Sequence, residues 1–164
     1  MTDAPIIDMC CGSRMFWFDK RDDRAVFLDA RSESHTLCDG RALNISPDIV
    51  GDFRQLPFPD ETFRMAIFDP PHLRRAGEKG WMRKKYGCLD KDNWPEDIAA
   101  GFREAFRVLV PGGTLIFKWN ATQIPVSQVI ALTERKPVIW QRTGKKDKTH
   151  WIIFLKEGAK PGVI

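Results

Sequence analysis

Short apolar runs of strand length recur along the chain, separated by polar segments that contain glycine or proline. They lie at residues 5–10, 25–28, 65–68, 114–119, 138–141 and 149–155. A short and continuous apolar run is typical of a strand buried on both faces, as in a parallel sheet, whereas a half-exposed strand alternates. The pattern therefore predicts strands distributed over the whole chain.

The clearest helical spacing begins at Trp94, with a proline and two acidic residues in the first turn, where helix geometry and dipole favour them. Apolar residues then share one face at Ile98, Phe102, Ala105, Phe106 and Leu109. We expect this helix to end at the Pro-Gly-Gly of residues 111–113, and a second helix at about 126–133. Residues 30–47 are polar and contain several breakers, and their pattern does not identify an element.

Length and composition fit a single domain. The chain has 164 residues, of which 43% are hydrophobic, so we expect one domain over residues 1–164. No segment is apolar enough to span a bilayer, and the amino terminus lacks a signal-peptide pattern. We therefore expect no contact with a membrane. Four cysteines lack the spacing of a zinc site, so we expect no metal, reduced thiols and a cytoplasmic location. They are Cys10, Cys11, Cys38 and Cys88.

The net charge of +4 is unevenly distributed along the chain. Residues 1–72 carry 8 basic and 13 acidic side chains, a net −5. Residues 73–95 carry 7 and 3, a net +4, and residues 133–164 carry 8 and 3, a net +5. This asymmetry suits an anionic partner such as nucleic acid, although a solvated surface would produce it too.

The sequence Asp69-Pro70-Pro71-His72 directly follows the apolar run at 65–68. Proline lacks an N–H group and has a fixed φ, so two prolines end a strand and stiffen the turn that follows. Such a turn holds the Asp69 carboxylate and the Pro70 carbonyl at the carboxyl edge of a sheet. In open α/β sheets this edge is where ligands bind.

These residues resemble the Asp/Asn-Pro-Pro-aromatic motif of class I S-adenosylmethionine-dependent methyltransferases that methylate exocyclic amino groups, with His72 in the aromatic position. Three further segments are similar to that family, in the expected order: Asp8 with Gly12, residues 48–68 with their Gly-Asp and Leu-Pro-Phe, and residues 107–115. The resemblance implies a Rossmann-like α/β fold. Its sheet is mostly parallel and seven-stranded, with an antiparallel last strand and helices on both faces.

The resemblance implies that S-adenosylmethionine is the cofactor. Gly12 would let the backbone approach it without a Cβ. Asp29, at the end of the second strand, is placed to accept hydrogen bonds from ribose hydroxyls, although it could equally be a helix cap. Asp52 would bind the adenine amino group and the Phe53 N–H a ring nitrogen. The cofactor-binding residues that we expect are Asp8, Cys10, Gly12, Asp29, Asp52, Phe53 and Asp69.

The expected chemistry follows from the weak nucleophilicity of a ring-conjugated amine. The Asp69 carboxylate and the Pro70 carbonyl would accept its two N–H groups and free the lone pair for attack on the sulfonium methyl. In related enzymes the fourth motif residue stacks on the base, a role that the flat ring of His72 can take. The expected catalytic residues are therefore Asp69, Pro70 and His72.

Residues 73–95 combine basic and aromatic side chains next to this motif, which suggests either a substrate loop or a lid that excludes water. The expected substrate-binding residues are Arg74, Arg75, Trp81, Lys84, Lys85, Tyr86 and Asn120. The first hypothesis is a nucleic-acid methyltransferase acting on the adenine 6-amino or cytosine 4-amino group of DNA or RNA. The alternatives are a methyltransferase for a small molecule or protein, and a non-catalytic module that binds the cofactor or nucleic acid.

Overall fold

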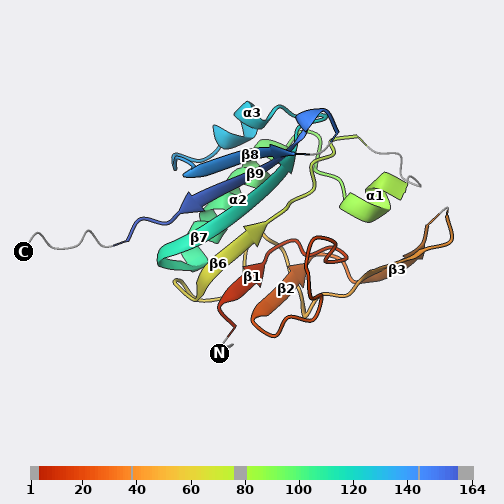
Figure 1. Cartoon of the computed structure of the whole chain (residues 1–164), viewed down its shortest axis with the longest axis horizontal. Coiled ribbons are helices and arrows are strands. Elements are labelled where there is room, and N and C mark those ends of the chain that lie inside the picture. The colour runs from red at the N-terminus through yellow and green to blue at the C-terminus, as the bar shows by residue number, and fades with distance from the viewer. Residues whose placement is uncertain (1–3, 38, 76–80, 144, 159–164) are drawn as a thin grey trace, which may run out of the picture.

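A seven-stranded sheet forms the centre of the computed structural model, which describes residues 4–37, 39–75, 81–143 and 145–158 (Figure 1). The strands are ordered β5-β2-β1-β6-β7-β9-β8 across the sheet. Their bounds are β1 Ile6–Asp8, β2 Ala25–Asp29, β5 Ile49–Val50, β6 Phe63–Phe68, β7 Leu109–Asn120, β8 Ile139–Thr143 and β9 Thr149–Leu155.

Strand direction divides the sheet into a parallel part and an antiparallel edge. The pairs β1–β2, β1–β6, β2–β5 and β6–β7 are parallel, whereas β9 runs antiparallel to both β7 and β8. The carboxyl ends of β1, β2, β5, β6 and β7 therefore meet at one edge. This arrangement confirms the predicted α/β fold, with its mostly parallel seven-stranded sheet and its antiparallel last strand.

The main helix, α2 (Trp94–Val108), packs against β6 and β7 and buries the apolar face that the sequence predicts (Figure 1). Phe68, Phe102 and Phe117 contact one another in the core between helix and sheet. Burial of each such ring is worth about 1.5–3 kcal/mol. The shorter helices are α1 (Trp81–Tyr86) and α3 (Val126–Ile130), and a single 3-10 turn covers Lys145–Asp147.

The predicted end of this helix at residues 111–113 is wrong. The helix ends at Val108, and Leu109 is already extended, with φ −75° and ψ 138°. Leu109 pairs with Phe63 and is fully buried, so strand pairing takes over before the Pro-Gly-Gly is reached. The strand then passes through these residues, where Gly112 has φ +77° and the pairing register with β6 shifts.

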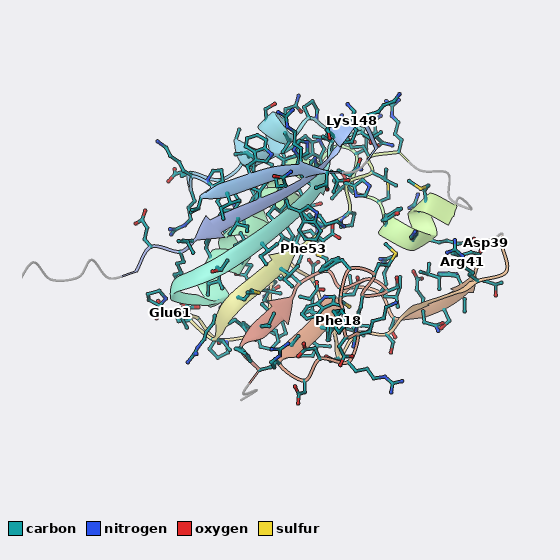
Figure 2. The ribbon with its side chains drawn as sticks, in the orientation of Figure 1. Phe18, Asp39, Arg41, Phe53, Glu61 and Lys148 are labelled. Atoms are coloured by element: carbon teal, nitrogen blue, oxygen red, sulfur yellow. The ribbon has the colours of Figure 1, made fainter. Side chains whose placement is uncertain are left out.

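The connections that follow β1 and β2 differ from the usual crossover, in which a helix joins two parallel strands. The segment between β1 and β2 contains turns instead of a helix, and the segment after β2 forms a hairpin of β3 (Glu33–Thr36) and β4 (Ala42–Ile45). Asp39 and Arg41 form an ion pair at the tip of this hairpin (Figure 2). The β1–β2 segment instead lies across the sheet, where the Phe16 ring meets Trp151 of β9 at 5.5 Å. Phe18, on the same segment, is fully exposed (Figure 2).

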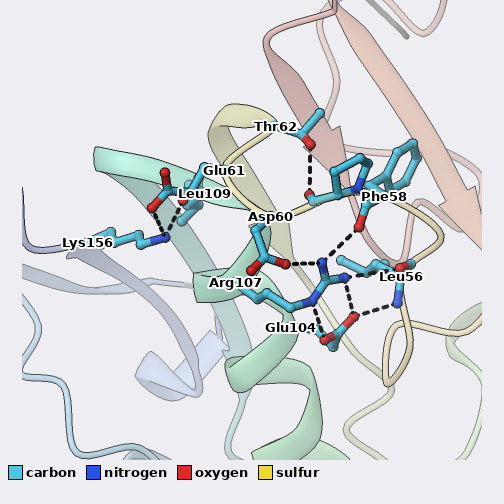
Figure 3. Close-up of polar contacts among 10 residues, drawn as sticks. Leu56, Phe58, Asp60, Glu61, Thr62, Glu104, Arg107, Leu109 and Lys156 are labelled. Carbon is cyan, nitrogen blue, oxygen red and sulfur yellow. Dashed lines mark hydrogen bonds and ion pairs between the residues drawn. The ribbon is translucent and has the colours of Figure 1, made fainter.

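The loop between β5 and β6 is fixed to α2 by Arg107 (Figure 3). Its guanidinium donates hydrogen bonds to the Phe58 and Leu56 carbonyls and to the carboxylates of Asp60 and Glu104. Glu104 in turn accepts the Leu56 N–H at 2.7 Å. Because every guanidinium nitrogen has a partner, this loop is held firmly to the helix. The residues at the start of the loop are thereby positioned at the carboxyl edge of the sheet.

Gly101 allows α2 to approach the sheet closely. A Cβ at this position would lie 2.2 Å from Cζ of Phe68 and 2.9 Å from Cδ2 of Phe53. Gly101→Ala should therefore lower the free energy of unfolding by about 1–3 kcal/mol through overpacking, although alanine is otherwise the better helix former. Urea denaturation measures this difference. Increased stability, as in an exposed helix, would contradict the close packing.

Candidate functional site

A cavity of about 380 Å³ opens at the carboxyl edge of the parallel strands. Its walls come from the loops after β1, β2, β5 and β6, from the end of α1 with the residues that follow it, and from Asp97 of α2. A volume of this size is within the range of small-molecule sites. The residues singled out from the sequence that line it are Cys10, Gly12, Asp29, Asp52, Phe53, Asp69, Pro70, His72, Lys85 and Tyr86.

The loop after β1 is bound to the end of β2 through Asp29. The Gly12 N–H donates to Oδ2 of Asp29 at 2.9 Å, and Oδ1 accepts the Arg31 N–H at 2.9 Å and its Nε–H at 3.3 Å. Gly12 has φ +50°, in the left-handed region that glycine adopts without strain, and nothing lies within 4 Å of where a Cβ would be. Backbone conformation is therefore what requires glycine in this structure.

Asp52 and Phe53 form the wall that follows β5. Arg54 donates through Nε and Nη2 to the Asp52 carboxylate, which lowers the pKa of Asp52, and through Nη1 to Asp97 at 2.9 Å. The Phe53 ring packs at 5.2 Å from Phe68 and lies near the carboxyl ends of the central strands (Figure 2). This wall thus presents an acidic group next to an aromatic face.

Asp69 lies at the centre of the strand edge and forms an ion pair with Lys118 of β7. Lys118 Nζ donates to Oδ2 of Asp69 at 2.6 Å, and each side chain is 21% exposed. Burial raises the pKa of Asp69, while the Lys118 ammonium opposes that rise. The sequence analysis missed Lys118, yet a signal was present: it is a lysine inside an otherwise apolar run predicted to be a buried strand.

His72 is the neutral aromatic group of the turn. Burial, and next the Lys118 charge, lower the pKa of His72 to about 4, so its imidazole carries no charge at neutral pH. Its ring centroid lies 5.3 Å from that of Tyr86 in α1 and 6.4 Å from that of Trp119 in β7. His72 therefore connects the sheet edge to α1 through ring contacts.

Asp8 is fully buried and is not among the residues that line the cavity. Its Oδ2 accepts the Trp17 indole N–H at 2.7 Å, and Oδ1 accepts the Cys10 N–H at 3.2 Å. Burial raises the pKa of Asp8 to about 7. In this structure Asp8 holds the β1–β2 segment in place. Cys10, Cys11 and Cys88 are free thiols that line the cavity, and burial raises the pKa of the first two.

The expected substrate residues are distributed over three places. Lys85 and Tyr86 line the cavity, and the Lys84 carbonyl accepts a hydrogen bond from Arg31 at 3.0 Å, which links α1 to the end of β2. The Arg74 and Arg75 N–H groups both donate to Gln123.

Asn120 lies outside the cavity lining, since its Oδ1 accepts hydrogen bonds from Thr122 and its Nδ2 donates to Thr149. The side chain of Trp81 is outside the described residues.

A second and wider cavity of about 680 Å³ adjoins the first and shares Gly12, Ser13, Met15 and Lys85 with it. It lies between the β1–β2 segment and the β3–β4 hairpin. Its charged lining residues are Arg14, Lys20, Arg21, Arg41, Lys85 and Asp48. Arg14 is already bound to Asp48 at 3.0 Å. The lining is nevertheless predominantly cationic.

Residues 4–37, 39–75, 81–143 and 145–158 are the part of the chain that the structure describes. Within it, no group of three or more histidine, cysteine or acidic side chains is arranged to hold a metal ion. Among the same residues, no helix has the length and apolar character needed to cross a membrane.

Comparisons with solved structures identify the fold. The PH0226 protein from Pyrococcus horikoshii matches with a TM-score of 0.61 and 16% identity, covering 93% of this chain and 81% of that one. A SAM-dependent methyltransferase from Methanosarcina mazei matches at 0.53 and 13%, covering 97% and 95%. The N-methyltransferase NodS from Bradyrhizobium japonicum matches at 0.54 and 12%, covering 93% and 85%. No protein-family model and no curated protein matches the chain.

The fold is therefore the Rossmann-like fold of class I S-adenosylmethionine-dependent methyltransferases, since strand order, direction and these structural neighbours agree. In such a sheet the ligand site is at the carboxyl ends of the parallel strands. The cavity of about 380 Å³ lies at this edge.

Ionisation of Asp8 should make stability depend on pH. The folded carboxyl keeps its proton up to about pH 7, whereas the unfolded one loses it near its usual pKa of about 4. The unfolded state therefore binds fewer protons between these values, and stability falls as pH rises through this window, by up to about 1.4 kcal/mol for each pH unit. Asp8→Asn removes this dependence.

Thermal melts of the unchanged protein and of Asp8→Asn between pH 5 and pH 8 measure the effect. The melting temperature of Asp8→Asn, relative to that of the unchanged protein, should increase with pH. Asp23 is an exposed acid on the same segment, and Asp23→Asn should show no such trend. Parallel curves for the unchanged protein and Asp8→Asn would contradict the buried and protonated state of Asp8.

Proposed function

We propose that this protein is an S-adenosylmethionine-dependent methyltransferase that acts on an exocyclic amino group of a nucleobase. The observation that carries the proposal is the cavity at the strand edge. Asp29 and Asp52, which suit the two ends of an adenosine, line the same cavity as Asp69 and Pro70, which suit an amine.

In this proposal the cofactor occupies the part of the cavity that follows β1, β2 and β5. Asp29 would accept the ribose hydroxyls, Asp52 the adenine amino group, and Phe53 would contact the adenine ring. The loop of Cys10 and Gly12 would face the methionine portion. When bound, the cofactor would supply an electrophilic methyl group on a sulfonium and would leave as the neutral thioether S-adenosylhomocysteine, so the donor needs no activation by the protein.

The protein's part in the reaction is to position and polarise the acceptor amine. One oxygen of Asp69 and the carbonyl of Pro70 accept the two N–H groups, which shifts the nitrogen toward a tetrahedral shape and makes its lone pair available. The negative charge of Asp69 stabilises the positive charge that develops on nitrogen. The proton then leaves to Asp69 or to water. Neutral His72, in contact with Tyr86, offers an uncharged flat surface to the base.

The cationic second cavity favours a nucleic acid as substrate. It adjoins the cofactor cavity through Gly12, Ser13, Met15 and Lys85, so a chain of phosphates lying in it would lead toward Asp69. Lysine and arginine side chains neutralise phosphates and give binding that weakens with salt. Since the target amine must enter a cavity, a single strand or a flipped-out base is required.

A small amine-bearing molecule is the second candidate substrate. The rings of His72 and Tyr86 contact each other and both line the cavity, which suits a flat ligand. A solved structural neighbour with a TM-score of 0.53 and 11% identity, from Burkholderia thailandensis, is a 1,6-didemethyltoxoflavin-N1-methyltransferase. Turnover that needs no polynucleotide would favour this candidate.

Substitutions of Asp69 and Asp29 should affect methyl transfer and cofactor binding differently. Asp69→Ala removes the amine acceptor and should lower the transfer rate about 100-fold or more. Its affinity for S-adenosylhomocysteine should stay within about tenfold of the unchanged protein, which is about 1.4 kcal/mol. Asp29→Ala removes a buried ionic acceptor and should weaken the same affinity by about tenfold or more.

Transfer is measured with radiolabelled S-adenosylmethionine on single-stranded DNA and on RNA, and binding by titration calorimetry. Asp69→Asn keeps one carbonyl acceptor and should retain more activity than Asp69→Ala. Asp92→Ala, an exposed acid outside both cavities, is the matched control. Full transfer activity in Asp69→Ala would refute the proposed mechanism.

A further inference from the structure

The ion pair at the centre of the strand edge joins two residues from neighbouring strands. Asp69 follows β6, and Lys118 lies near the end of β7, directly after the paired residues Phe68 and Phe117. Parallel pairing thus brings the ammonium to 2.6 Å from Oδ2 of Asp69. Nothing in the sequence motif of Asp69 requires this partner.

Aromatic rings hold the Lys118 side chain in this position. Its Nζ lies 5.3 Å from the ring centroid of Phe16 and 5.6 Å from that of Trp151. The two rings also contact each other edge to face at 5.5 Å. A cation within about 6 Å of aromatic faces is attracted to them. The ammonium is therefore held between this ring pair and the Asp69 carboxylate.

We propose that Lys118 is a positioning residue for the methyl-transfer reaction: it binds Oδ2 of Asp69, keeps that group a carboxylate, and leaves Oδ1 as the acceptor for the substrate amine. This inference rests on the proposed function. Lys118 acts through Asp69 and through the state of His72, and it needs no contact of its own with the substrate.

The charges around Asp69 explain why a cation is needed there. Asp8 and Cys10 approach from β1, His72 from the same turn, and Lys118 from β7. Burial favours the protonated form of Asp69, and Lys118 is the group that opposes this. A protonated carboxyl would keep only a neutral carbonyl as acceptor, so its hydrogen bond to the amine would be weaker, and the negative charge that stabilises the developing cation would be lost.

The same ammonium disfavours a second positive charge on His72. A neutral imidazole is the form that can lie against a base without repelling the charge that develops on its amine. Lys118 thus acts on two protonation states: it opposes the effect of burial at Asp69 and favours the carboxylate, and it adds to the effect of burial at His72 and favours the neutral imidazole. Both states are those that the proposed chemistry requires.

The test compares Lys118→Met with Lys118→Arg. Loss of the cation should raise the pKa of Asp69, so the acidic limb of the pH profile of kcat/KM should move up by about one unit or more, which is about a tenfold loss at a fixed pH on that limb. Lys118→Arg keeps the charge and should retain the profile of the unchanged protein. A matched control is Lys156→Met.

Lys156 also has a largely buried side chain, bound to the Leu109 carbonyl at 2.6 Å, but it lies outside both cavities. Its loss should lower stability without moving the pH profile. If Lys118→Met moves the profile no more than Lys156→Met does, the inference is overturned. If Lys118→Met folds poorly, Lys118→Gln takes its place in the comparison with Lys118→Arg. The two variants must then differ in the pH profile of kcat/KM for the inference to hold.

A readout without turnover separates this inference from the proposed function. The pKa of Asp69 is followed by carbon NMR of protein labelled at aspartate carboxyls, with Asp69→Asn to assign the signal. Removal of Lys118 should raise that pKa whether or not a substrate is known. An unchanged pKa would overturn the inference, whereas an unchanged protein that transfers no methyl group would overturn the proposed function instead.

Discussion

The pairing of β6 between β1 and β7 determines where the charged groups of the site lie. Asp8 is in register with Ile67, and Phe68 is in register with Phe117. Asp69, at the end of β6, therefore lies between β1, which carries Asp8, and β7, which carries Lys118. If the register of β6 changed by one residue, side chains would exchange faces and this arrangement would be lost. The proposed chemistry thus depends on the packing that fixes this register, which includes the close approach at Gly101 and the contacts of Phe68 with Phe102 and Phe117.

Each acidic residue at the strand edge has its own partner, which is what allows several carboxyl groups to lie close together. Asp29 accepts hydrogen bonds from Gly12 and Arg31, and Asp69 is paired with Lys118. Asp8 accepts hydrogen bonds from Trp17 and Cys10, and burial shifts it toward its protonated form. Buried charges are tolerated only with such compensation. The resulting edge combines several carboxylate acceptors, which are the groups that the proposed adenosine and amine ligands would require.

The sequence was sufficient for the elements whose signals are local. Strands at 65–68 and 149–155 and the apolar face of α2 follow from short runs and helical spacing, and the structure confirms them. The β3–β4 hairpin was not predicted because β3 is polar throughout, and the alternation of Leu43 and Ile45 in β4 extends over only four residues among breakers. The helix end was misplaced because pairing of Leu109 with Phe63, a contact between distant residues, overrides the proline and glycines that follow.

For the site, the sequence identified residues that line the cavity but not the partners that set their charge. Asp29, Asp52 and Asp69 are recognisable from their places at strand ends. Lys118, the partner of Asp69, and Trp17, the partner of Asp8, become visible only when neighbouring strands and the β1–β2 segment are placed in space. Asp8 shows the same limit: its similarity to the acidic residue of the family's first motif led us to expect a cofactor contact, and only the fold reveals its hydrogen bonds with Trp17 and Cys10.

The most direct measurement is identification of the methylated product. The protein is incubated with radiolabelled S-adenosylmethionine and, in parallel, with single-stranded DNA, duplex DNA, RNA and a metabolite extract, and labelled products are digested and resolved. The account predicts label on the 6-amino group of adenine or the 4-amino group of cytosine. Label on a carbon atom, a hydroxyl or a phosphate, or no label in any sample, would contradict it.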